Sequence, residues 1–178
     1  MSAAVELIPM FCLRCQSAIS AQPDEAAWVC EQCGQGLLLS DEKGFAALDF
    51  HYAEGIPPGT SGKPFWVAEG KVAIQRTTYH GDRSGEMLAF WQSPRRFFIP
   101  AYDLPLGEVT ALSANLLRQP PVLNPGSPAK FIPITVPPQD MRPLAEFTIL
   151  SIEAERKDDL KTIEFQLQLE EPQLWVLP

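Results

Sequence analysis

The chain has 178 residues, an apolar fraction of 46%, 18 prolines and a formal net charge of −8. This length fits one ordinary domain with a small appendage, or two small domains, and roughly twice the average proline usage argues against an all-helical bundle. Residues 1–60 contain two basic and eight acidic side chains, so this part of the protein would repel a phosphate backbone.

The compartment follows from two further features of the sequence. No apolar run approaches the about 18–20 residues that a membrane-spanning helix needs, and residues 1–11 lack the basic start and long apolar stretch of a secretory signal. We therefore expect a cytoplasmic protein without a membrane span, whose thiols stay reduced. Four cysteines confined to 22 residues are then metal ligands rather than a disulfide framework.

The first element in the chain is this cysteine cluster. Cys12 and Cys15 form one C-x-x-C pair, and Cys30 and Cys33 form a second, with fourteen residues between the pairs. A C-x-x-C turn presents two sulfurs to one ion, and four thiolates make the closed tetrahedral site of structural zinc. Gly34 follows the second pair, at a position where a left-handed backbone is often required.

The motif C-L-R-C at 12–15, with W-V-C-E-Q-C-G-Q-G at 28–36, resembles the zinc ribbon family over roughly residues 10–40. The resemblance implies strands that lead into and out of paired turns. It also implies one structural Zn²⁺ ion with four ligands, Cys12, Cys15, Cys30 and Cys33. Gln16 stands where the motif has a glycine after the first pair, so we expect that turn to be less regular.

Other uses of four cysteines fit the sequence less well. A rubredoxin-like iron site uses the same ligands, but its pairs are usually farther apart. Redox-active dithiols would need a surrounding βαβ pattern, and catalytic zinc needs an open coordination position that four sulfurs do not leave. Because some 30 residues bury too little apolar surface to fold alone, we expect metal binding to supply the folding free energy.

Beyond a zinc ribbon at 1–41, the chain divides into a linker or bridging segment at 42–63 and a β-rich domain at 64–178. The segment begins with FAALDFHYA, a short strand, and continues into a loop rich in glycine and proline at 54–64. The following strand, 65–79, has four apolar residues of one parity that indicate a buried face: Trp66, Ala68, Val72 and Ile74.

A turn at 80–86 and a returning strand at 87–91 complete a predicted antiparallel hairpin. The one predicted helix spans 105–119, where an amphipathic stripe ends before two prolines; the stripe is Val109, Leu112, Leu116 and Leu117. Its apolar face packs on the sheet or, alternatively, meets a partner helix. The expected fold class is α+β, mainly β: the ribbon followed by a mostly antiparallel domain with this helix.

Eight prolines in 120–143 predict a long wrapping loop with a short strand at 130–136, or alternatively a polyproline ligand for a partner's aromatic groove. Residues 145–154 and 161–170 predict a second antiparallel hairpin, since the latter alternates apolar and polar side chains. Trp175 should pack on the body or on another subunit.

The sequence contains few candidates for catalysis or nucleic-acid binding. Tyr79, His80, Asp82 and Arg83 share one turn, where functional side chains gather, and His51 is the second histidine. None of the common catalytic motifs appears, and the pairs Asp158-Asp159 and Glu170-Glu171 are expected to be solvated charge.

The run Arg95-Arg96-Phe97-Phe98 combines basic and aromatic side chains, as in single-strand nucleic-acid binders. Four residues are a small footprint in an acidic chain. We expect Phe97 or Phe98 to be buried in the sheet, while the arginines face solvent or an acidic partner.

These observations favour a non-catalytic zinc-binding protein that acts as a protein–protein interaction adaptor or accessory subunit. Two alternatives stay open: a transcription- or RNA-associated zinc ribbon protein, and an enzyme with a site near His80. The first rests on fold-level analogy. We expect a protein partner, no nucleic-acid partner, and identify no small-molecule substrate.

Overall fold

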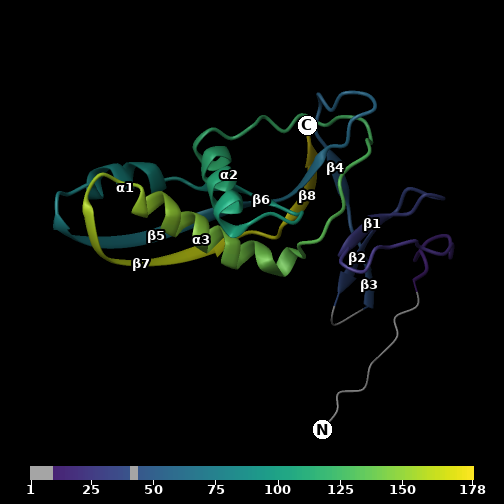
Figure 1. Cartoon of the computed structure of the whole chain (residues 1–178), viewed down its shortest axis with the longest axis horizontal. Helices are drawn as coiled ribbons and strands as arrows, with labels where there is room; N and C mark the ends of the chain where they lie inside the picture. Colours follow the sequence, from purple (N-terminus) through teal and green to yellow (C-terminus); the bar gives the residue numbers. More distant parts are fainter. Residues whose placement is uncertain (1–9, 41–43) are drawn as a thin grey trace, which may run out of the picture.

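The computed structural model describes residues 10–40 and 44–178. A small three-stranded sheet lies at one end, and a larger sheet with helices forms an elongated body (Figure 1). The strands are β1 Ala27–Val29, β2 Gly36–Ser40, β3 Gly44–Ala47, β4 Phe50–Tyr52, β5 Lys63–His80, β6 Arg95–Pro100, β7 Asp159–Leu169 and β8 Gln173–Leu177. The helices are α1 Ser84–Trp91, α2 Leu106–Arg118 and α3 Met141–Ala154, with a 3₁₀ turn, η1 Pro138–Asp140, before α3.

The small sheet has the order β1-β2-β3, and both of its pairings are antiparallel. Two residues after β3, the chain enters β4, which pairs in parallel with β8 of the larger sheet. The predicted bridging segment at 45–53 therefore contributes one strand to each sheet. We call residues 10–40 and 44–47 the cysteine lobe, and residues 50–178 the body.

The 18-residue strand β5 is the axis of the body. One of its edges pairs with β6, and the other pairs first with β8 and then with β7, all antiparallel. The predicted parity is confirmed: Trp66, Ala68 and Val72 belong to the main core, and Ile74 packs against it. Along the first part of β5, Phe65 and Val67 on the other face are buried as well.

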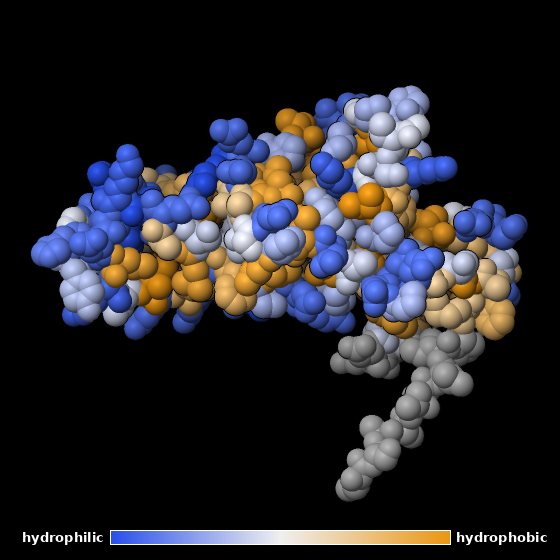
Figure 2. Space-filling view, in the orientation of Figure 1, coloured by the Kyte–Doolittle hydropathy of each residue, from blue (hydrophilic) through white to orange (hydrophobic). Residues whose placement is uncertain are grey.

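The main core lies between the larger sheet and the helices α1 and α3 (Figure 1). The helix predicted at 105–119 is confirmed as α2. It packs on β6 and α3, with Ala114 and Leu117 in the main core and Leu112 and Leu116 against a second cluster around Phe65 and Phe98. Hydrophilic side chains cover the end of the paired strands β5 and β7 that lies farthest from the small sheet, whereas apolar side chains gather over α3 (Figure 2).

Residues 87–91 were predicted as a strand, and this prediction was wrong: they belong to α1. Met87 and Trp91 are the buried residues of this segment. These two residues are four positions apart, a spacing that puts them on the same face of a strand and also on the same face of a helix. A segment of five residues therefore does not distinguish a strand from a helix. The strand that follows β5 and pairs with it is β6, not 87–91.

Residues 145–154 were also predicted as a strand, and they form most of α3. The buried positions Met141, Ala145, Ile149 and Ile152 follow the spacing of four, four and three residues that one helical face requires. Phe147 is 47% exposed, which contradicts a buried strand face through Ile149. The true partner of residues 161–170 is β5, 85 or more residues earlier, and the described residues form three α-helices rather than one.

The proline-rich segment contacts both lobes without forming the strand predicted at 130–136. It makes isolated bridges, Phe131 with Gly62 and Ile134 with Ala27, because prolines interrupt the row of backbone donors that a ladder needs. The Ala26 amide donates to the Ile134 carbonyl at 2.7 Å, and Ile134 and Ala27 are buried in the main core.

The cysteine lobe is therefore packed on the body. The division at 1–41, 42–63 and 64–178 stays a prediction, and its first boundary lies at residues outside the described ones.

Candidate metal centre

Two tight turns bring the four cysteines together. In the first, the Gln16 amide donates to the Cys12 carbonyl at 3.0 Å, and in the second, the Gly34 amide donates to the Cys30 carbonyl at 2.8 Å. Gln16 and Gly34 have φ angles of 60° and 71°, so both turns end in the left-handed region. The expectation of a less regular first turn was wrong: Gln16 adopts the glycine conformation, at a cost of roughly 1–2 kcal/mol for a residue with a Cβ atom.

The four sulfurs have the geometry of a single ion site. All lie within 4.8 Å of one another, and the closest pairs join the two turns: Cys12 to Cys33 at 3.6 Å and Cys15 to Cys30 at 3.5 Å. A tetrahedron with metal–sulfur bonds of about 2.3 Å has sulfur–sulfur edges of about 3.8 Å. None of the four is in a disulfide. The residues present therefore fit a metal ion with four thiolate ligands.

Hydrogen bonds and burial set the pKa values of these thiols apart. The Ser17 hydroxyl, whose oxygen lies 3.3 Å from the Cys15 sulfur, and the Ser17 amide lower the pKa of Cys15 to about 6. The backbone amide of Gln35 lowers the pKa of Cys33, but burial and the three neighbouring sulfurs outweigh it and raise that pKa to about 12. Four thiolates this close repel one another, and a bound cation removes that repulsion.

The apolar surroundings of the cluster are small. Cys12, Cys30 and Leu37 are its buried members, with Ile19, Cys33 and Phe45 packed against them. Trp28 meets Phe45 edge to face at 5.6 Å and donates its indole N–H to the Glu25 carboxylate at 2.7 Å.

The candidate catalytic turn is built from residues with other contacts. Tyr79 is 67% exposed and His80 is exposed. The Ser84 side chain, and then the Ser84 amide that donates to Asp82 at 2.8 Å at the start of α1, lower the pKa of the Asp82 carboxyl group. Arg83 pairs with Glu86 at 2.7 Å. The Arg83 amide donates to Asp158 at 3.0 Å, whereas no hydrogen bond or ion pair reaches the His80 side chain among the described residues.

In the basic-aromatic run, the expected burial is confirmed, but Arg95 is half-buried instead of facing solvent. Phe97 and Phe98 are fully buried. The Arg95 guanidinium lies over the Phe90 ring and donates to the Phe90 carbonyl, and Arg96 pairs with Glu69 at 3.1 Å. These side chains are thus engaged within the chain.

A buried ion cluster lies at the far end of the body, and the sequence interpretation missed it. Arg76 donates to Asp158 at 2.6 Å and lies 3.7 Å from Glu153, and all three side chains are fully buried. Glu153 also accepts hydrogen bonds from Arg156 and from the Trp91 indole. The expectation that Asp158 is solvated was wrong. The parity of β5 was the available signal, because Arg76 shares it with the buried Val72 and the partly buried Ile74.

The second histidine, His51, stacks on Trp175 with ring centroids 5.0 Å apart, so Trp175 packs on the body.

Among the described residues, no helix is both long enough and apolar enough to cross a membrane. The chain matches no protein-family model, no curated protein and no solved structure. The candidate site therefore rests on its own geometry: four cysteines that are close enough to hold one metal ion.

Proposed function

We propose that the protein is a non-catalytic zinc-binding protein of the cytoplasm, whose residues 10–40 form a zinc ribbon and whose role is that of an adaptor or accessory subunit for a protein partner. The observation that carries this proposal is the cluster of four sulfurs within 4.8 Å. It supplies a complete tetrahedral ligand set, which is the arrangement of structural rather than catalytic zinc.

Zinc is favoured over other ions by the ligands. Thiolates are soft ligands that select Zn²⁺, Cu(I) or iron, and a tetrahedral set of four with no fifth group is the commonest structural zinc site. Each C-x-x-C pair belongs to a tight turn that ends in the left-handed region, so the two turns direct all four sulfurs toward one point.

The adaptor role is supported by how the cysteine lobe is held and what it exposes. Its β1 strand is bridged to Ile134 of the body, so the two lobes form one platform. Phe11 and Leu13, on either side of Cys12, are 49% and 47% exposed. Large apolar side chains that the chain leaves uncovered beside a rigid turn are available to a partner.

The test joins metal analysis to partner capture. Elemental analysis and native mass spectrometry of the full chain should give one zinc ion per chain; iron, or metal-free protein with a folded lobe, would contradict the zinc assignment. A tagged chain expressed in its own host should co-purify one partner in constant stoichiometry. Recovery of the chain only as a monomer at its cellular concentration would contradict the adaptor role.

A further inference from the structure

The second half of β5 has one edge that no strand occupies. β6 pairs with β5 from Phe65 to Gly70. The outermost pair is Gly70 with Arg95, the first residue of β6. On the opposite edge, β7 continues the pairing as far as His80. From Val72 onward, therefore, β5 is paired on one edge only within the part of the chain that the structure describes.

The backbone groups that face this open edge can be identified. In a strand, the N–H and C=O groups of successive residues point to opposite edges in turn. The Glu69 carbonyl accepts from the Glu170 amide on the β7 side, and the Pro64 carbonyl accepts from the Ala101 amide on the β6 side. Even-numbered residues thus face the β6 side, and Val72 and Ile74 direct their N–H and C=O groups toward the open edge.

The outer edge of β7 provides a contrast. There the Arg142 guanidinium donates to the Leu167 carbonyl at 2.8 Å, and a charged side chain on an edge is a common protection against strand addition. Among the described residues, no hydrogen bond of this kind reaches Val72 or Ile74.

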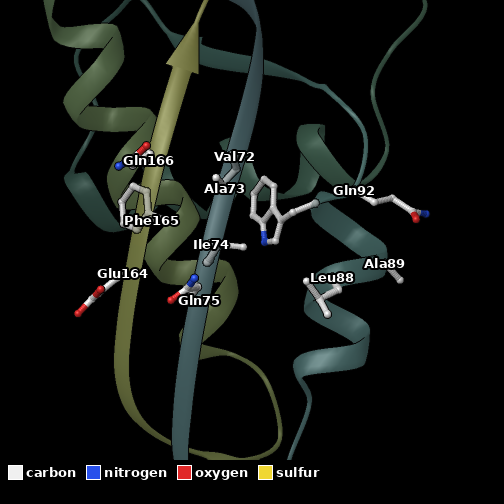
Figure 3. Close-up of a pocket in the computed structure, with 11 residues that line it drawn as sticks. Val72, Ala73, Ile74, Gln75, Leu88, Ala89, Gln92, Glu164, Phe165 and Gln166 are labelled. Atoms are coloured by element: carbon white, nitrogen blue, oxygen red, sulfur yellow. The ribbon is translucent and has the colours of Figure 1, made fainter.

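A groove of about 1040 Å³ runs beside the open edge, between β5 and α1 (Figure 3). Residues 72–75 of β5 and, beyond them, residues 164–166 of β7 form one wall, and Leu88 and Ala89 of α1 lie on the other. Trp91 of α1, which is buried, also lines the groove. Leu88 is 59% exposed, so the α1 wall offers an apolar surface that the chain itself leaves uncovered.

The near absence of charged side chains in the groove indicates what kind of segment it can bind. Glu164 is the one ionisable side chain in the lining, and it points away from α1 (Figure 3), although 20% of the whole chain is charged. A charged group placed here would lose water without gaining a counter-charge, which is costly. The matching occupant is uncharged. It is also extended, because only an extended backbone pairs with donors and acceptors at every second residue.

We propose that an uncharged, extended segment of a partner protein adds to the larger sheet as a strand along Val72 and Ile74, in line with β6 and with apolar side chains against Leu88. This inference rests on the proposed adaptor role and names the surface and the kind of segment bound. Main-chain hydrogen bonds to β5 would supply affinity, and the α1 wall would supply specificity.

Hydrogen exchange on the full metal-loaded chain tests whether the edge is open. We expect the amides of Val72 and Ile74 to exchange about tenfold or more faster than those of Ala73 and Gln75, which face β7. Equal protection of all four amides would overturn the inference.

A displayed library of random octapeptides is the probe for binding. We expect selection of uncharged sequences with alternating apolar residues, and a synthetic copy of one should slow exchange at Val72 and Ile74. Leu88→Lys should weaken this peptide about tenfold or more, whereas Leu106→Lys, a matched change of an exposed leucine on α2, should leave its affinity unchanged. Both variants should keep their metal and the protection of the body.

Failure to select any binder, binding that protects other amides, or equal affinity for Leu88→Lys would overturn the inference. The adaptor role is judged separately, by the partner that co-purifies with the full chain. A partner that binds Leu88→Lys as tightly as the wild type would support the adaptor role and contradict only the proposed binding in the groove.

Discussion

The cysteine lobe and the body differ in how much apolar surface each buries. Cys12, Cys30 and Leu37 are the buried members of the cluster around the sulfurs, whereas the body gathers buried side chains from β5, β6, α1, α2 and α3 into one core that includes Trp66, Phe97 and Ile149. At about 25 cal/mol per Å² of apolar surface, burial of this extent supports the body without help. The lobe needs a second source of free energy, and its four thiols offer one in metal binding.

This difference indicates that the two regions depend on different chemistry although they pack together. The join between them includes the backbone hydrogen bond from Ala26 to Ile134 and the packing of Ala27 and Leu38 on the main core. We expect a change away from this join to affect only its own side, and four predictions test this separation.

Loss of the metal should have the largest effect and should be confined to the cysteine lobe. Cys30→Ser replaces a buried sulfur ligand, and metal binding in such lobes contributes roughly 10–16 kcal/mol of folding free energy. We expect loss of the metal and of hydrogen-exchange protection in 10–40, with protection of the body core retained. Ser17→Ala, beside Cys15 but not a ligand, is the control and should keep its metal. A protected lobe in metal-free Cys30→Ser would show that the apolar contacts suffice.

Removal of Glu153 should destabilise the body and leave the metal bound. Glu153→Ala deprives the buried Arg76 of one of its two carboxylates and the Trp91 indole of its acceptor. Because Asp158 still pairs with Arg76, the cost should not exceed the about 3–5 kcal/mol of a buried ion pair that loses one partner. Urea unfolding followed by tryptophan fluorescence would measure the loss, since Trp91 donates to Glu153.

Glu155→Ala is the matched control for this variant. Its pair with Arg118 is solvent-exposed, so its loss should cost about 0–1 kcal/mol. Equal losses from the two variants would mean that the buried cluster contributes no more than a surface ion pair.

A side chain at Gly36 should loosen the join between the lobes. A Cβ atom there would overlap the Leu48 carbonyl oxygen and the Phe50 ring, and overpacking of this kind costs roughly 1–3 kcal/mol. Gly36→Val should retain the metal but speed amide exchange at Ala26 and Leu48, as NMR would show. Gly85→Ala, where nothing lies within 4 Å of the added atom, should change neither. Unchanged exchange in Gly36→Val would argue that the lobes are held elsewhere.

The smallest expected effect concerns the two cysteine turns. Gln16→Gly removes the cost of a left-handed glutamine and should strengthen metal retention by up to about 1 kcal/mol, less the extra freedom of glycine in the unfolded chain. Gly34→Gln makes the reverse change and should weaken it. Competition with a chelator measures both, and the prediction is wrong if the two variants shift retention in the same direction.

Strands and helices with a long apolar pattern, and the cysteines that are close in the chain, could be predicted from the sequence. Short apolar segments that suit both a strand and a helix could not. The strand at 65–79, its buried parity and the helix at 105–119 each rest on a pattern long enough to fix its own period. Residues 87–91 and 145–154 contain apolar side chains that suit both a strand and a helix over so short a stretch. The contacts of Trp91 with Glu153 and of Ile149 with the core decided for the helix.

By itself, the sequence determined which four cysteines cluster, the mainly β class and the elements with a strong period, because each depends on residues that are near one another in the chain. The tertiary structure alone decided the pairing of β7 with β5, the packing of the cysteine lobe on Ile134, and the burial of Arg76 with Asp158, which lies 82 residues away. Spacing and periodicity carry no information about such distant partners. A charged residue becomes a core residue only when the fold places its counter-charge beside it.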